Sequence, residues 1–251
     1  MSAAALRQRI SEQEWAQRVN LAACYRLVAL YGWDDLVFTH ISARVPGRHD
    51  AFLVNRYGDL FEEVTASSLV KVDLEGRILE GEGPVNPAGL IIHSAIHEAR
   101  KDAECVIHLH SRAGVAVAAQ EQGLLPISQI SLFPLSALAY HDYEGVALNP
   151  EEKARLVADL GANSMMLLRN HGTLALGPSV ADAFLAMYTL ERACETQVLA
   201  QSGGGALRQV PAPILAGIRA QAAEATRGLG GELAWPALLR RLNRLDPSYQ
   251  H

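Results

Sequence analysis

The chain of 251 residues is 49% hydrophobic and 20% charged, the composition of a globular protein long enough for one large domain with a full core. Its formal net charge of −5 gives no electrostatic footprint for nucleic acid or an anionic membrane, so we expect neither as a partner. The sequence carries neither the apolar core of a signal peptide at its start nor a run of roughly 18 apolar residues, so we expect a cytoplasmic protein.

The first third of the chain predicts one long helix followed by short strands. Ser11 and Glu14 form a capping box that opens the helix, and Gly32 ends it. The buried side of this helix is predicted to carry Trp15, Val19, Ala22, Ala23, Leu27 and Leu30. Strands are predicted at 36–43, 52–55 and 70–79, the last interrupted by a turn at Glu75 and Gly76.

Strands and helices alternate through the middle of the chain. The predicted elements are a helix from 89 to about 100, a strand around His108, a helix from about 112 to 120, a helix starting at Asn149-Pro150-Glu151-Glu152, and a long helix from about 180 to 200. A hairpin around His171 precedes the long helix. Short strands that alternate with helices but have several hairpin-like links predict an α/β protein, a mixed sheet with helices on both faces.

The triplet Gly203-Gly204-Gly205 is the one convincing linker in the sequence. It predicts a main domain of residues 1–202 and a C-terminal extension of residues 203–251, with helices at 213–225 and 235–245. A basic cluster on the last helix is interpreted as a solvated face or as a docking face for a neighbouring subunit. It consists of Arg240, Arg241 and Arg244.

Three cysteines, Cys24, Cys105 and Cys194, are odd in number, widely spaced and surrounded by apolar residues. This pattern favours buried, reduced thiols over a disulfide framework or a cysteine-based zinc site.

Three histidines form the most informative pattern in the chain. His108 and His110 lie two residues apart in the apolar run Val106–His110, which favours a strand, so both side chains point to the same face and can reach one ion. His171 follows a second apolar run and stands in Asn170-His171-Gly172, where the glycine permits a close backbone approach. A histidine on an apolar strand is usually a hydrogen-bonded structural residue. Three of them at strand ends instead predict a metal site with an open coordination position.

Several longer segments give the chain a family likeness. It resembles the class II aldolase/adducin family over about residues 12–204, and it looks closest to the adducin head domain and its bacterial relatives. The segments that carry the likeness are Gly32-Trp33, Thr39–Arg44, Thr65–Leu69, Val85–His97, Val106–His110, Gly123–Pro126 and Leu167–Gly172.

The resemblance implies a three-layer α/β/α fold around a central mixed, largely antiparallel sheet. It also implies a cyclic tetramer with active sites at subunit interfaces, and it assigns the three metal-ligand positions of the family to His108, His110 and His171. The metal of the family's aldolases is zinc, so Zn²⁺ is the expected cofactor. Mn²⁺ and Fe²⁺ stay open because sequence does not separate these ions.

The sequence departs from the sugar-phosphate aldolases of this family at the groups that perform their chemistry. The acid/base glutamate aligns with Gly89, and the tyrosine that assists protonation falls near Ile130. The two serines of the phosphate pocket fall at Pro87 and Ala88, and its glycine-asparagine contact becomes Thr39-His40. A chain with these replacements is not expected to cleave a sugar phosphate by the mechanism of those aldolases.

Other residues are therefore needed as proton-transfer groups, and we consider three candidates, His40, His93 and Tyr143. His93 is expected to face the site from the helix that follows Gly89. His97, four residues further on, is expected to be a surface or packing residue, because Ser94 replaces the glutamate of an H-E-x-x-H motif. For each candidate the alternative is a structural polar residue.

The expected function is that of a metal-dependent carbon–carbon lyase acting on a small-molecule substrate. A neutral three-histidine site leaves the ion its full charge, which suits a non-phosphorylated oxo or hydroxy acid that chelates through two oxygens. The reaction would be decarboxylation or retro-aldol cleavage. Two alternatives stay open: a non-catalytic, adducin-like binding or scaffold module, and a three-histidine iron(II) oxygenase.

Overall fold

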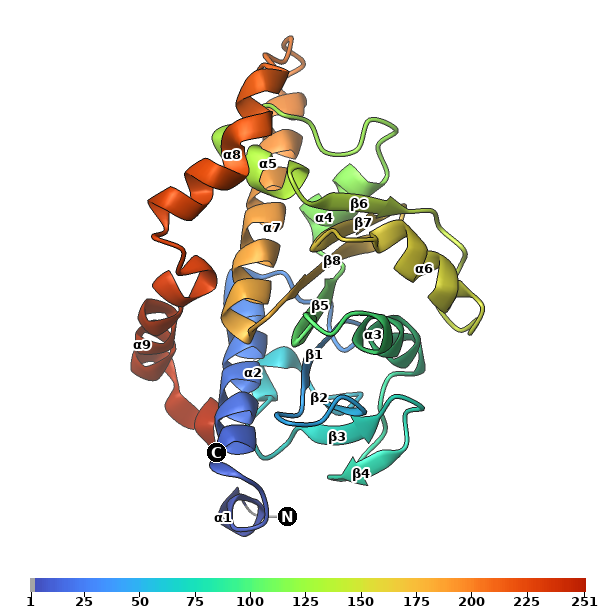
Figure 1. Cartoon of the computed structure of the whole chain (residues 1–251), viewed down its shortest axis with the longest axis vertical. Coiled ribbons are helices and arrows are strands. Elements are labelled where there is room, and N and C mark those ends of the chain that lie inside the picture. The colour runs from blue at the N-terminus through green and yellow to red at the C-terminus, as the bar shows by residue number, and fades with distance from the viewer. Residues whose placement is uncertain (1–2) are drawn as a thin grey trace.

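The computed structural model describes residues 3–251 and is organised around one eight-stranded sheet (Figure 1). The strands are β1 (His40–Arg44), β2 (Ala51–Val54), β3 (Val70–Asp73), β4 (Ile78–Glu80), β5 (Cys105–Leu109), β6 (Leu138–His141), β7 (Met165–Leu168) and β8 (Gly172–Gly177). Their order in the sheet is β4-β3-β2-β1-β5-β8-β7-β6, and every neighbouring pair is antiparallel except β6 and β7. The predicted mixed, largely antiparallel sheet is confirmed.

Helices cover both faces of this sheet. They are α1 (Ala3–Arg7), α2 (Glu12–Tyr31), α3 (Pro87–Ala99), α4 (Arg112–Ala118), α5 (Gln129–Leu135), α6 (Glu152–Leu160), α7 (Val180–Ser202), α8 (Ala212–Ala225) and α9 (Trp235–Leu245), with 3-10 turns η1 (Phe61–Glu63), η2 (Gly230–Leu233) and η3 (Pro247–Gln250). The long helices α2 and α7 lie on one side of the sheet, and α3 and α6 lie on the other (Figure 1). The largest apolar core fills the first interface, and a smaller one fills the second.

The helix predicted after Ser11 has the boundaries that the sequence indicates. The Ser11 side chain accepts a hydrogen bond from the backbone N–H of Glu14, and Gly32 ends the helix with φ at 70°. Leu30 is 38% exposed, so its assignment to the buried side was wrong. It lies in the last turn of the helix, which ends at Tyr31.

Two predicted boundaries were off by three or more residues, and the helices α1 and α5 and the strand β6 were not predicted. The first strand begins at His40 because Leu36 adopts φ of 48°, a left-handed turn that no strand contains. Helix α6 begins at Glu152, after the Asn149 side chain has capped a turn. Helix α5 contains an internal proline, and β6 runs parallel to β7; neither element carries a periodic pattern long enough to indicate it.

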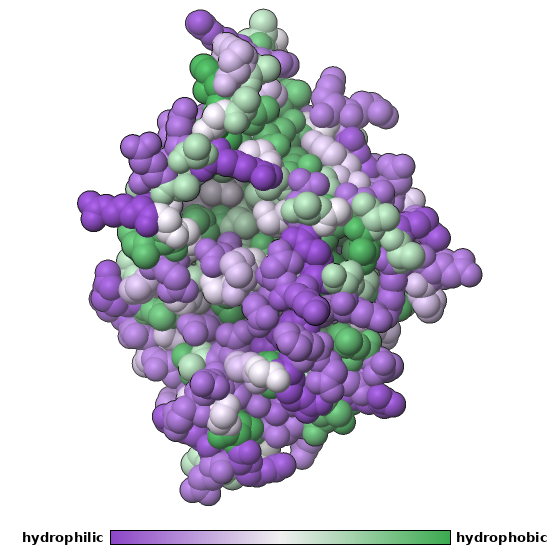
Figure 2. Space-filling model, in the orientation of Figure 1, coloured by the Kyte–Doolittle hydropathy of each residue, from purple (hydrophilic) through white to green (hydrophobic). Residues whose placement is uncertain are grey.

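The C-terminal segment after the glycine triplet packs back over α7 and α2 (Figure 1). Trp235 is buried, and its Nε1 donates a hydrogen bond to Asn20 Oδ1 at 2.8 Å. The backbone N–H of Ser67 donates to the carbonyl of His251 at 2.8 Å. Green apolar atoms gather near the top of the molecule, where α8 lies against α5 (Figure 2). The division into residues 1–202 and 203–251 stays a prediction.

The basic side chains of α9 are exposed, and the Arg241 guanidinium lies 5.6 Å from the centre of the Tyr31 ring. The three cysteines are free and buried, as predicted. None of the helices within residues 3–251 is long and apolar enough to cross a membrane.

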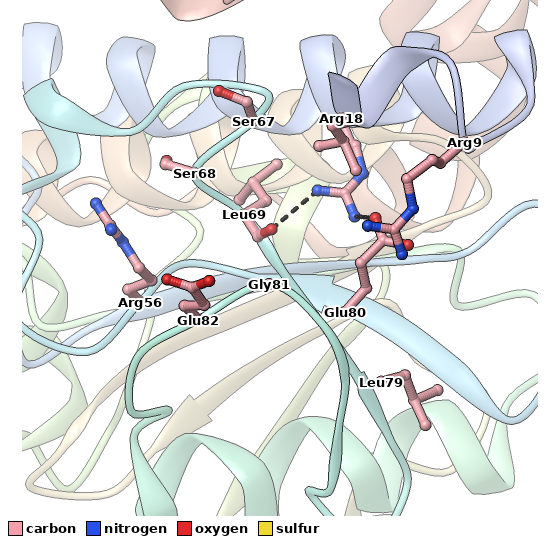
Figure 3. A pocket seen from close by; sticks show the side chains of 11 residues that line it. Arg9, Arg18, Arg56, Ser67, Ser68, Leu69, Leu79, Glu80, Gly81 and Glu82 are labelled. Carbon is pink, nitrogen blue, oxygen red and sulfur yellow. Dashed lines mark hydrogen bonds and ion pairs between the residues drawn. The ribbon is translucent and has the colours of Figure 1, made fainter. Parts of the chain in front are cut away.

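A buried network of charges joins α2 to β3 and β4. The Arg18 side chain is fully buried and pairs with Glu14 at 3.1 Å and Glu80 at 3.5 Å. Lys71 Nζ lies 2.8 Å from the second oxygen of Glu14. Arg18 also donates to the carbonyl of Leu69, the contact drawn in Figure 3 beside a pocket of about 500 Å³. Because these charges satisfy one another, the network is structural.

Breaking this network should destabilise the fold. Arg18→Met leaves the carboxylates of Glu14 and Glu80 short of a partner in a buried position, and we expect a loss of about 3–5 kcal/mol in unfolding free energy. The matched control is Arg7→Met, which breaks the exposed pair of Arg7 with Glu12 and should lose less than about 1 kcal/mol. Urea denaturation of both variants measures the difference, and equal losses would contradict the assignment.

Candidate metal centre

Three imidazoles converge where β5 and β8 meet. Side chains alternate along β5, so His108 and His110 emerge on the same face, and the turn before β8 brings His171 to them. The ring nitrogens of the three residues lie within 4.8 Å of one another. His108 is buried, whereas His110 and His171 are half-buried. The three histidines singled out in the sequence are therefore brought together in space.

The turn that carries His171 depends on its two neighbours. Asn170 has φ of 57°, a left-handed conformation that asparagine tolerates better than most residues. A Cβ added to Gly172 would lie 2.3 Å from the carbonyl oxygen of Leu109, so only glycine lets β8 approach the end of β5 this closely.

Hydrogen bonds fix the orientation of two of the rings. His108 Nδ1 lies 3.1 Å from the Thr173 carbonyl, and His110 Nδ1 lies 3.1 Å from the Asp35 carboxylate. Both partners accept hydrogen bonds, so each Nδ1 carries the hydrogen and each Nε2 keeps a lone pair. The two Nε2 atoms face each other at 3.0 Å. Two lone pairs at this distance repel unless a cation lies between them, so the donor set fits a divalent metal ion.

The electrostatics of the cluster also suit a cation. Burial, followed by the neighbouring imidazoles, holds the pKa of His108 well below its usual value. Burial and His110 lower the pKa of His171 to about 4. Both rings are therefore neutral near pH 7, which is the protonation state a metal ligand needs.

A buried carboxyl group on α7 supports the strands behind the cluster. Glu191 accepts hydrogen bonds from Thr173 Oγ1, at 2.7 Å, and from Ser111 Oγ. Burial raises the pKa of Glu191 to about 7. Because Ser111 follows His110 and Thr173 follows the glycine of the turn, Glu191 ties together the two segments that carry the imidazoles.

The imidazoles line a cleft of about 350 Å³. Its other lining residues are Asp35, Phe38, His40, Tyr57, Asn86, Ala88, Ile92, Tyr143, Gly145, Val146 and Ala147. None of these lining residues is lysine or arginine. Phe38, Tyr143 and Val146 are each about half exposed or more, so the rim of the cleft is largely apolar.

The structure separates the three proton-transfer candidates. His40 and Tyr143 line the cleft, and the Tyr143 ring lies 6.2 Å from the ring of His171. His93 does not line it, contrary to expectation: the side chain lies behind His40, with its Nε2 2.8 Å from His40 Nδ1. His97 is buried in the same layer and does not lie on the surface.

The ring of His40 occupies the space beside Gly89. A Cβ added to Gly89 would lie 2.6–2.9 Å from three atoms of the His40 ring, so a glutamate at this position would have to displace that ring. Gly89 has no side chain, and the imidazole of His40, from β1, fills the space that a side chain there would occupy.

Three residues of the site were not predicted from the sequence: Asp35, Thr173 and Glu191. Asp35 carries only a weak signal, a pair of acidic residues after Gly32-Trp33. Glu191 lies among charged and polar residues of a long helix, and nothing in the sequence indicates that this one side chain turns inward.

The raised pKa of Glu191 predicts a pH-dependent stability. The folded-state value of about 7 exceeds the ordinary value of 4.5, so the contribution of the protonated form is complete below pH 4.5 and is lost as the pH rises through 7. We expect the unfolding free energy of the native protein, relative to Glu191→Gln, to fall by about 3 kcal/mol over this range. Glu224→Gln, on the exposed side of α8, should leave the native profile unchanged. Parallel profiles for the native protein and Glu191→Gln would refute this role.

Comparisons with known proteins show that the chain is similar to members of one protein family. The model of the "Class II Aldolase and Adducin N-terminal domain" family matches residues 19–198. A Pseudomonas aeruginosa protein assigned by name to the class 2 aldolases is 61% identical over 96% of this chain and 94% of its own length. Alpha-adducin of Rattus norvegicus is 43% identical over 91% of this chain, which covers 33% of that protein.

A solved structure extends the comparison to an enzyme. L-fuculose 1-phosphate aldolase from Glaciozyma antarctica superposes with a TM-score of 0.82 at 27% identity, over 96% of this chain and 93% of that one. The matching sheet, the three converging histidines and these similarities lead to one conclusion. The chain belongs to the class II aldolase and adducin N-terminal domain family.

Proposed function

We propose that this protein is a metal-dependent lyase that cleaves a carbon–carbon bond of a small, non-phosphorylated oxo or hydroxy acid. The convergence of His108, His110 and His171 on one point of a cleft is the observation that carries the proposal. These three side chains would hold one divalent ion, with Zn²⁺ as our choice for three neutral imidazoles. When bound, such an ion would act as a Lewis acid toward a carbonyl or carboxylate oxygen.

The charges of the cleft support a substrate without a phosphate group. Phosphate sites in proteins use arginine, lysine or several free backbone N–H groups. Asp35 is the only side chain with a formal charge at neutral pH among the lining residues of the described chain, and it is acidic. Proline and alanine, at Pro87 and Ala88, provide no side-chain donor near the start of α3. A compact acid with an uncharged remainder fits the apolar rim better than a sugar phosphate does.

His40 and Tyr143 are our candidates for the groups that contact the substrate, because both line the cleft with the three ligands. His93 acts behind His40 rather than on the substrate. Decarboxylation demands less of these groups than aldol cleavage, since carbon dioxide leaves without the help of a base. We therefore favour decarboxylation within the lyase proposal.

The relationship to adducin supports a second candidate, a non-catalytic binding module. Adducin continues well beyond the matched region, since this chain covers only 33% of it. A module that only binds another protein has no need for three imidazoles with free lone pairs around an open cleft, so we rank this candidate second. An iron(II) oxygenase would use the same ligands and differs in the metal.

We further propose a homotetramer in the cytoplasm as the working form.

Removal of two ligands should abolish metal binding. We expect one divalent ion per chain in protein purified without chelator, and none in His108→Ala/His110→Ala, as measured by plasma mass spectrometry. Asp35→Asn should weaken zinc binding about 10–100-fold, because it removes the carboxylate that orients His110. His49→Ala, in an exposed loop, is the matched control. An unchanged metal content in the double variant would contradict the site.

The activity test compares two classes of substrate. The zinc-loaded protein should release carbon dioxide or an aldehyde from at least one member of a panel of oxo and hydroxy acids, and the double histidine variant should not. It should fail to cleave L-fuculose 1-phosphate. Cleavage of that phosphate at a rate typical of an enzyme would overturn the proposed substrate class. A metal-loaded protein that is inert toward the whole panel would favour the binding module, and oxygen uptake by an iron-loaded form would favour the oxygenase.

A further inference from the structure

One face of β1 carries polar side chains where a core strand normally carries apolar ones. His40 and Ser42 alternate with apolar residues along the strand and point toward α3. His93 and His97, one helical turn apart on α3, point back toward them. All four side chains are almost completely buried. A buried polar layer of this kind is stable only if its members hydrogen-bond to one another.

The four side chains form a continuous relay of hydrogen bonds that ends on the main chain. His40 Nδ1 lies 2.8 Å from His93 Nε2, and His93 Nδ1 contacts Ser42 Oγ. Ser42 Oγ lies 2.8 Å from His97 Nε2, and His97 Nδ1 lies 3.0 Å from the carbonyl oxygen of Ala103. The relay therefore runs from the cleft to the loop after α3.

The carbonyl at the far end determines the direction of every hydrogen bond in the relay. The Ala103 oxygen only accepts, so His97 carries its hydrogen on Nδ1 and accepts through Nε2 from the hydroxyl of Ser42. Because Ser42 donates its only hydroxyl hydrogen to His97, its oxygen accepts a hydrogen bond from His93 Nδ1. His93 in turn accepts through Nε2 from His40 Nδ1. This assignment is the only one that satisfies all four contacts with neutral rings.

The rings are neutral in this environment. Each ring is almost completely buried, and none of the relay's hydrogen bonds involves a carboxylate that would offset a positive charge. Burial lowers the pKa of His93 well below its usual value, and burial together with the charge of Arg44 lowers that of His97 to about 3. His40 consequently has a hydrogen on Nδ1 and a lone pair on Nε2. Within residues 3–251, Nε2 has no hydrogen-bond partner, and the ring lines the cleft.

We propose that this relay fixes His40 as a hydrogen-bond acceptor toward the cleft, and that the ligand which pairs with it is a hydroxy acid rather than an oxo acid. A hydroxyl group can donate to His40 Nε2, whereas a keto oxygen placed there would oppose a lone pair. Ser42, His93 and His97 are positioning residues that act through His40. The identity of the ligand rests on the proposed function, but the tautomer of His40 does not.

The tautomer can be measured without any activity. In ¹⁵N-histidine-labelled, zinc-loaded protein, two-bond ¹H–¹⁵N correlation spectra distinguish a hydrogen on Nδ1 from one on Nε2, and His40→Asn identifies the signals of His40. We expect the Nδ1–H form in the native protein. Ser42→Ala should give a mixture of the two forms, and Ser42→Thr, which keeps the hydroxyl, should restore the single form.

Two further variants separate the relay from general damage to the core. Ser94→Ala changes another buried serine, on α3 but outside the relay, and should leave the His40 signals unchanged. His97→Phe keeps the ring that stacks on Phe52 at 5.0 Å but removes both nitrogens, so it should release the tautomer as Ser42→Ala does. An Nε2–H form in the native protein, or a His40 tautomer insensitive to both Ser42→Ala and His97→Phe, would overturn the relay.

The ligand is tested with a matched pair of acids, mandelate and phenylglyoxylate, which differ only in hydroxyl against keto oxygen. We expect zinc-loaded protein to bind mandelate more tightly by calorimetry. Ser42→Ala should weaken mandelate about two- to fivefold, because only the fraction of protein with the Nδ1–H form then accepts the hydroxyl group. It should not weaken phenylglyoxylate, because the Nε2–H form can donate to the keto oxygen. Equal losses for the two acids, or binding of neither, would overturn the assignment of a hydroxy acid, while the spectra would still decide the relay.

Discussion

The pairing of β5 with β8 is the constraint on which the candidate site depends. In this register His108 lies opposite Leu174 and Leu109 lies opposite Thr173, so the carbonyl of Thr173 lies within reach of His108 Nδ1. A shift of one residue would send both β5 imidazoles to the other face of the sheet. The absence of a side chain at Gly172 allows this pairing to continue to the end of β5. One set of strand contacts thus brings the imidazoles together and orients one of them.

The two faces of the sheet are stabilised in different ways. The face toward α2 and α7 is mostly apolar and contains the largest core of the molecule, with Glu191 and its partners as a buried polar exception. The face of β1 toward α3 instead holds a polar layer, which gains its stability from complete hydrogen bonding rather than from the burial of hydrocarbon. At the C-terminal end of α3, the Arg44 side chain borders this layer and donates hydrogen bonds to the carbonyls of His97 and Arg100. Such a layer requires each polar member to meet its partner, so it restricts the sequence more than an apolar core does.

The cleft holds three imidazoles, and none of its lining residues is lysine or arginine. The L-fuculose 1-phosphate aldolase shares the fold over nearly the whole chain, yet the residues near the start of α3 here are Pro87, Ala88 and Gly89. The ring of His40 fills the space beside Gly89 and faces the cleft from a neighbouring strand. Polar function at this point of the cleft is therefore supplied by β1 rather than by α3. This arrangement, together with the absence of lysine and arginine from the lining residues, is the physical basis for proposing a substrate other than a sugar phosphate.

Features that depend on short-range geometry could be predicted from the amino-acid sequence alone. The two-residue period of a strand places His108 and His110 on one face, the capping residue Ser11 and the terminal Gly32 bound α2, and the alternation of strands and helices predicts the layers. Other features are visible only in the tertiary structure. They are the relay, the carboxylates of Asp35 and Glu191 beside the site, and the position of β6 in the sheet. Apart from His97 and Ala103, which are six residues apart, the partners lie 18 to 80 residues apart, and their pairing depends on strand register and on helix packing. The sequence identifies each polar side chain and the hydrogen bonds that it can make. Which atom becomes its hydrogen-bond partner depends on how distant segments pack together.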